Sequence, residues 1–109
     1  MEQGQVDFAT AFAGLAERGE REATAPLGGV DVRLVRVPAG GEGRWDSHPD
    51  TTETVVVWSG EFSVEFRDRT LLLGKGQCCV VPVGAEHRGT SPTGAEVVLF
   101  RKTPDTGSG

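Results

Sequence analysis

The chain has 109 residues, of which 37% are hydrophobic and 25% are charged, so one domain with a single core is expected. Its net charge is -5 and its basic residues are scattered, which argues against nucleic-acid binding. No apolar run approaches the ~20 residues of a membrane-spanning helix, and acidic residues stand near the start, where a signal peptide is basic and apolar. A cytoplasmic protein with no membrane partner is therefore predicted.

Residues 7–18 are expected to form one amphipathic helix. Their apolar side chains recur at helical spacing: Phe8, Phe12, Leu15 and Ala16. Asp7 is a suitable residue to cap the start, and Gly19 is a suitable end. Because the polar face is acidic or neutral, packing on the outside of the domain is favoured over membrane binding. Residues 1–29 are therefore interpreted as an N-terminal helical arm.

From Val30 onward, short apolar segments alternate with glycine-containing turns. The expected strands are 30–34, 54–58, 62–66, 70–73, 77–81 and 96–101. Alternation is strict over 62–67, which predicts interior and exterior sets: Phe62, Val64 and Phe66 inside, Ser63, Glu65 and Arg67 outside. Strands at this spacing indicate an all-β sandwich or barrel. We expect this barrel to span 30–102 and to be followed by a flexible tail, 103–109.

Cys78 and Cys79 are the only cysteines, and they are adjacent. Neighbours on a strand point to opposite faces, so these two thiols are poorly placed to bond each other. Two free thiols in a reducing compartment are therefore predicted. Packing is favoured for both over a redox role, because the chain has no Cys-X-X-Cys motif.

The only two histidines, His48 and His87, stand at predicted strand ends beside carboxylates and glycines. Asp46 shares a face with His48 if this stretch is extended. Glu53 falls on the face of two valines, where a carboxylate is costly unless something neutralises it. Imidazole and carboxylate donors suit iron, manganese, nickel, cobalt or zinc. The alternative is a pair of hydrogen-bonded histidines with no metal.

The spacing of these residues resembles the two motifs of the cupin superfamily. The first motif reads Gly40, five residues, Asp46-Ser47-His48, four residues, Glu53, six residues, Gly60. The second reads Gly76, five residues, Pro82-Val83-Gly84, two residues, His87, three residues, Ser91. The family pattern has histidine where Asp46 stands and asparagine where Ser91 stands. The resemblance covers residues 30–102, and the chain looks like a mannose-6-phosphate-isomerase-like subgroup of small single-domain cupins.

This resemblance implies a double-stranded β-helix, or jelly-roll barrel, of six to eight antiparallel strands with a short N-terminal helix. Carried over by position, the ligand set for a divalent metal is Asp46, His48, Glu53 and His87. The metal implied is iron, manganese, nickel or zinc. Asp46 is either a ligand or a solvent-facing acid, and Asp50 is a less favoured alternative ligand in its place.

The function implied is metal-dependent chemistry on a small polar metabolite, of the isomerase, lyase or dioxygenase type. The alternative is a non-catalytic barrel that binds a small molecule, with a weakened or lost metal site, and the Asp46 replacement favours it somewhat. The resemblance also suggests a homodimer. Trp45 and Trp58 are expected to pack at the barrel mouth or at a subunit contact, in preference to stacking on a ligand.

Overall fold

The computed structural model describes residues 5–102, so the predicted tail at 103–109 lies outside the described residues. Helix α1, Phe8–Arg18, begins after Asp7, whose carboxylate accepts a hydrogen bond from the Thr10 backbone N–H. It ends at Gly19, whose φ of 67° is left-handed and is favoured by glycine because no Cβ is present. The predicted helix and both its ends are confirmed. Within 5–102, no helix is long and apolar enough to cross a membrane.

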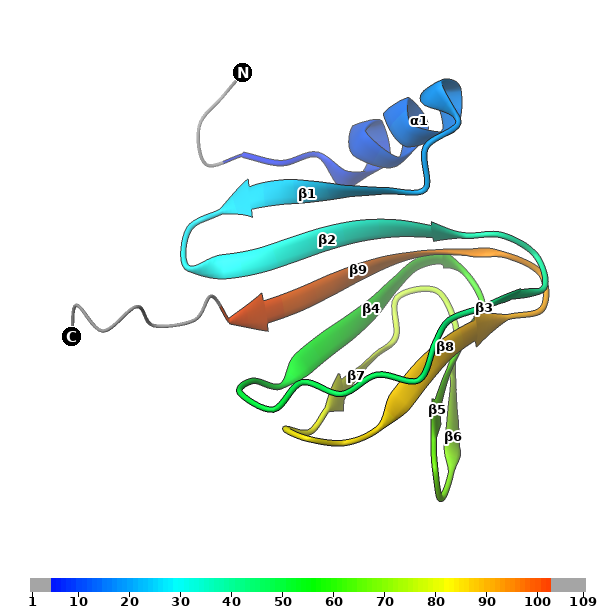
Figure 1. The fold of residues 1–109 in the computed structure, drawn as a ribbon. Coiled ribbons are helices and arrows are strands. Elements are labelled where there is room, and N and C mark those ends of the chain that lie inside the picture. The colour runs from blue at the N-terminus through cyan, green and yellow to red at the C-terminus, as the bar shows by residue number, and fades with distance from the viewer. Residues whose placement is uncertain (1–4, 103–109) are drawn as a thin grey trace.

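Nine strands in the described part of the chain form two antiparallel sheets (Figure 1). The five-stranded sheet contains, in order, β1 (Glu22–Leu27), β2 (Val30–Val37), β9 (Ala95–Lys102), β4 (Glu53–Gly60) and β7 (Cys78–Val81). The four-stranded sheet contains, in order, β3 (Gly41–Glu42), β8 (His87–Ser91), β5 (Phe62–Phe66) and β6 (Thr70–Leu73). This architecture confirms the predicted all-β jelly-roll class, although its nine strands exceed the six to eight expected.

Three strands, β1, β3 and β8, are not indicated by the sequence pattern. Strand β8 reads His-Arg-Gly-Thr-Ser and is buried only at its two ends, so it has no apolar alternation. It forms because β5 pairs with one of its edges and β3 with the other. Strand β1 pairs with β2 along its whole length. The sheet therefore extends into 22–27, which the pattern assigns to the helical arm.

The interior core lies between the two sheets. Phe62, Val64 and Phe66 are buried there, as the alternation of 62–67 predicts. Arg67 is exposed, and Ser63 and Glu65 are half-buried on the other face of β5. The inward orientation of this strand is therefore confirmed.

A second core lies on the opposite face of the five-stranded sheet, under α1 (Figure 1). Phe12 and Leu15 of the helix pack there with Val32, Leu34 and Val98. Burial of this face explains why the helix is amphipathic, and it confirms the expected packing outside the barrel.

Trp58 packs against the helix and not at the barrel mouth, which was one of its two expected places; the other, a subunit contact, stays a prediction. Its ring meets Phe8 edge-on at 5.8 Å between centroids and stacks on Phe12 at 6.4 Å. The physical reason is its parity on β4, which directs its side chain away from the interior residues Val55 and Val57.

Ser91, which stands where the family pattern has asparagine, has a structural role at the end of β8. Its side chain is fully buried. The hydroxyl donates to the Glu61 carbonyl oxygen at 2.6 Å and accepts from the Gly94 N–H at 2.9 Å. Ser91 therefore links the turn between β4 and β5 to the turn between β8 and β9.

Candidate metal centre

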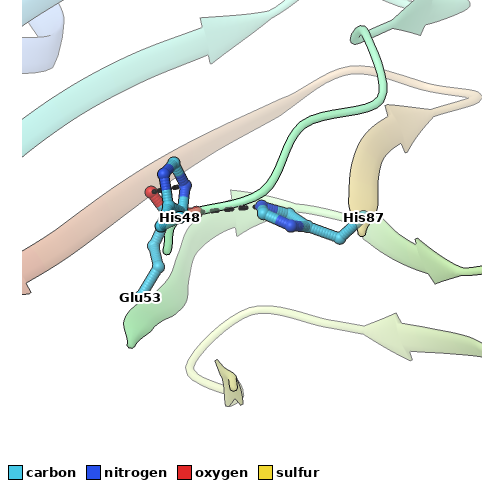
Figure 2. Close-up of side chains that lie close together, drawn as sticks. All are labelled: His48, Glu53 and His87. Atoms are coloured by element: carbon cyan, nitrogen blue, oxygen red, sulfur yellow. Dashed lines mark ion pairs between the residues drawn. The ribbon is translucent and has the colours of Figure 1, made fainter. Parts of the chain in front are cut away.

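Three polar side chains converge between the sheets: His48, Glu53 and His87. His48 lies in the segment between β3 and β4, Glu53 is the first residue of β4, and His87 is the first residue of β8. One ligand atom from each residue lies within 4.8 Å of the other two. Figure 2 shows the Glu53 side chain joined by ion-pair contacts to both imidazoles.

The segment that carries His48 is irregular, but hydrogen bonds hold its backbone in place. Asp46 forms an isolated antiparallel bridge with His87, with two hydrogen bonds of 2.9 Å. The His48 carbonyl accepts a third bond, 2.8 Å long, from the N–H of Gly84. Gly84 has a left-handed φ of 76°, so its place in the second motif is suited to glycine. The second motif therefore positions the histidine of the first.

Glu53 is the acidic centre of this cluster and is only 5% exposed. Its Oε2 lies 3.4 Å from His48 Nε2, and its Oε1 lies 3.4 Å from His87 Nε2. Burying a carboxylate is costly unless positive charge or hydrogen bonds compensate for it. Each oxygen of Glu53 faces one imidazole nitrogen, and these contacts help to compensate for its burial.

The orientation of His87 points to a metal ligand. Its Nδ1 lies 3.0 Å from the Ala85 carbonyl oxygen. A carbonyl only accepts hydrogen bonds, so Nδ1 carries the ring proton and donates it. In the neutral ring, Nε2 then presents a lone pair to the Glu53 oxygen. Two acceptors that face each other in this way fit a bound cation between them.

The donor atoms also match a transition metal by type. Two imidazole nitrogens with one carboxylate oxygen suit iron, manganese, nickel or zinc. The same set forms the facial triad of non-haem iron sites, which leaves coordination positions open for substrate. The structure thus brings together His48, Glu53 and His87, and their role as ligands stays a prediction.

Asp46, the fourth predicted ligand, is not part of this close cluster. Its side chain is exposed, and its Oδ1 accepts a hydrogen bond from the Ser47 N–H at 2.8 Å. It nevertheless lines the same cavity as the other three residues. Its role as a ligand also stays a prediction. Asp50, the suggested substitute, is exposed as well.

Arg101 is a site residue that the motifs do not indicate. Its Nε lies 3.7 Å from Glu53 Oε2, and its Nη1 lies 3.3 Å from His48 Nδ1. Its Nη2 contacts Asp31 Oδ2 at 3.4 Å. One signal was present in the sequence, because Arg101 has the parity of the interior residues Val97 and Leu99 on the predicted strand 96–101.

A cavity of about 650 Å³ opens beside the cluster. Apolar side chains of β4, β5 and β9 form part of its wall: Val55, Phe62, Val64 and Leu99. Polar groups lie there too, namely Arg33, Arg44, Arg88 and Trp45. Charged side chains thus make up a large part of the lining beside the apolar wall, which suits a small polar molecule.

Trp45 lies at this cavity, where it was expected, and it is enclosed by two arginines. The guanidinium of Arg67 lies 3.8 Å from its ring centroid and that of Arg88 lies 5.1 Å away. Cation–π contacts of this kind hold an aromatic ring in place. The Trp45 ring is therefore fixed by the protein itself at one side of the cavity.

Both cysteines are free thiols, as predicted. Cys79 packs against the interior core, and burial raises the pKa of its thiol. Cys78 points to the other face of β7 and is exposed, so the expected packing does not hold for it. The physical reason is that α1 covers other parts of this outer face.

The comparisons with known proteins agree with this fold. Residues 33–100 match the family described as Cupin domain. The chain is 32% identical over 71 residues to uncharacterized protein YdbB of Bacillus subtilis (strain 168), and the match covers 63% of each protein. It resembles a cupin-2 domain containing protein of Shewanella frigidimarina, with TM-score 0.78, 24% identity, and 90% and 94% of the two chains covered. Protein NMB1881 of Neisseria meningitidis gives TM-score 0.81 and 22% identity, with 91% and 99% covered.

Fold and site together define a jelly-roll protein with a candidate metal centre between its sheets. The family match spans more than half of the chain, and the chain belongs to the cupin family. The chain spans about 63% of the length of its Bacillus relative. The two solved structures share less than 25% identity with it and support the fold alone. The mannose-6-phosphate-isomerase-like subgroup stays a prediction.

Proposed function

We propose that this protein is a metal-dependent cupin that holds a divalent transition metal with His48, Glu53 and His87. Its substrate is a small polar metabolite, and its chemistry is of the isomerase, lyase or dioxygenase type. The observation that carries the proposal is the orientation of His87. With its Nδ1 on the Ala85 carbonyl, the ring presents Nε2 to a buried carboxylate 3.4 Å away.

The chemistry of such a site begins with what the metal supplies. A bound divalent ion polarises a substrate oxygen as a Lewis acid. The chain itself supplies three ligands, and it fixes one of them because the Ala85 carbonyl orients the His87 ring. The apolar wall formed by Val55 and Leu99 limits access of water to one side of the bound substrate.

A second candidate is a non-catalytic barrel that binds a small molecule with a weak metal site or none. Asp46 favours it, because this position provides an exposed carboxylate that accepts a hydrogen bond from the Ser47 N–H, in place of the family's imidazole. The two functions differ in what the purified protein contains. Stoichiometric iron, manganese, nickel or zinc supports the first, and a metal-free protein supports the second.

Calorimetric titration of chelator-stripped protein tests the ligand set. We expect Glu53→Gln and His87→Gln to lower the affinity for manganese, nickel or zinc by at least about tenfold. Glu86→Gln is the matched control. Glu86 precedes His87 in the sequence, but its carboxylate is exposed and pairs with Arg67. If Glu53→Gln and His87→Gln bind the ion as tightly as the control Glu86→Gln, the site is rejected.

We also propose that the protein is a homodimer. Exposed apolar side chains support this, and they include Val80 on the edge strand β7, which is 55% exposed. Light scattering during size-exclusion chromatography should report about twice the chain mass of 11.5 kDa. A mass of one chain across the accessible concentration range would contradict the dimer.

A further inference from the structure

Three charged side chains form a row across the five-stranded sheet at the metal centre. Arg101 on β9 pairs directly with Asp31 on β2 and with Glu53 on β4. Directly paired residues project to the same face of a sheet, so the charges alternate negative, positive, negative along this row. The guanidinium contacts both carboxylates, at 3.4 Å for Asp31 and 3.7 Å for Glu53. The sheet register therefore places a fixed positive charge beside the buried acid of the candidate site.

Arg101 also determines which nitrogen of His48 carries the ring proton. Its Nη1 lies 3.3 Å from His48 Nδ1. A guanidinium has only donors, so Nδ1 accepts, and the proton of the neutral ring lies on Nε2, facing Glu53. His48 can offer Nε2 to a metal only when that proton lies on Nδ1 instead. There it would face the N–H groups of Arg101, and two donors would oppose each other.

We propose that Arg101 is the internal counter-cation of Glu53 and that it lowers the metal affinity of the site by competing for Glu53 and His48. The inference rests on the proposed function, because it concerns the same three ligands. Among residues 5–102, no arginine or lysine is paired with the His87 ring, which the Ala85 carbonyl orders for a metal. Arg101 thus acts through Glu53 and His48 as a positioning residue. Metal uptake requires that its guanidinium moves away from these two side chains.

Titration of chelator-stripped protein with Zn²⁺ or Ni²⁺ tests this competition. We expect Arg101→Gln to bind the ion at least about tenfold more tightly than the wild type, because a like charge is removed from the site. Arg101→Lys keeps the charge and the donors, so its affinity should stay nearer to that of the wild type. Arg18→Gln is the matched control, because it removes the same charge from the last residue of α1, which forms an exposed pair with Glu20.

Asp31→Asn tests the same idea with Arg101 intact and expects the opposite sign. The guanidinium then loses its second carboxylate and holds Glu53 more tightly, so metal affinity should fall several-fold. This variant keeps the proposal testable if circular dichroism shows that Arg101→Gln is unfolded. Unchanged metal affinity in Asp31→Asn contradicts the competition.

The remaining outcomes separate this inference from the proposed function. If the wild type binds the ion and folded Arg101→Gln binds it equally or more weakly, the competition is wrong and the metal site stands. Equal tightening in Arg101→Gln and Arg101→Lys would also overturn it, because the charge would then not matter. If neither the wild type nor any variant binds an ion, the proposed function fails and the competition fails with it.

Discussion

The backbones of Asp46 and His87 exchange two hydrogen bonds, each 2.9 Å long. Residues that pair directly in an antiparallel bridge project their side chains to the same side. The side chains of Asp46 and His87 therefore leave the backbone on the same side, the side on which the His87 imidazole reaches Glu53. Both residues line one cavity. A histidine at position 46, whose side chain is longer than that of aspartate, is therefore expected to reach the site.

We therefore predict that Asp46→His raises the affinity for nickel or zinc by about tenfold, equivalent to about 1.4 kcal/mol. The substitution restores the histidine of the family pattern and adds a third imidazole. Calorimetric titration of chelator-stripped protein measures the gain. Asp50→His is the control, because this exposed position lies outside the residues that line the cavity. With the fold intact by circular dichroism, no gain at position 46 would remove Asp46 from the site.

Gly60 should be far less tolerant of a side chain than Gly76. Both have a left-handed φ, 79° for Gly60 and 82° for Gly76. A Cβ on Gly60 would lie 2.2 Å from the Gly94 carbonyl oxygen, whereas a Cβ on Gly76 meets nothing within 4 Å. We expect Gly60→Ala to lower the free energy of unfolding by at least about 2 kcal/mol more than Gly76→Ala. Urea melts that show equal losses would refute the close contact between the two turns.

Phe66→Ala should lower the free energy of unfolding by about 3–5 kcal/mol. The side chain is 7% exposed and belongs to the interior core, so its loss leaves a cavity. Glu65→Ala removes the neighbour on the opposite face, which pairs with Arg88, and should cost no more than about 1 kcal/mol. Denaturant melts measure both values. A similar loss at the two positions is the result that this assignment does not allow.

Cys78 should react with a thiol reagent well before Cys79 at neutral pH. Cys78 is exposed, whereas desolvation is the main cause that raises the pKa of the Cys79 thiol, with the charges of Cys78 and Glu53 adding to it. A raised pKa leaves less thiolate, the reactive form, and the deficit shrinks as the pH rises. The two labelling rates are measured separately in the Cys78→Ser and Cys79→Ser variants between pH 7 and 10. This range extends about one to two pH units either side of the pKa of a free thiol. Equal rates at neutral pH would contradict the burial of Cys79.

The sequence alone was sufficient for the elements whose signals are local. The helix follows from apolar spacing and from its caps, Asp7 and Gly19. The orientation of β5 follows from strict alternation, because a strand with one buried face needs apolar residues at every second position. The candidate ligands His48, Glu53 and His87 were found by their spacing in two motifs, since each motif places a ligand at the start or end of a strand.

Only the tertiary structure decided the features that depend on pairing between distant segments. Strand β8 carries no apolar alternation and exists because β3 and β5 hydrogen-bond to its edges. Arg101 enters the site because the register of β9 sets it directly between Asp31 and Glu53. Register is a non-local property, since a shift by one residue would turn Arg101 to the other face while its sequence neighbours stayed the same. The sequence was enough to indicate the residues that can hold a metal. The register of the strands places the positive charge of Arg101 beside them.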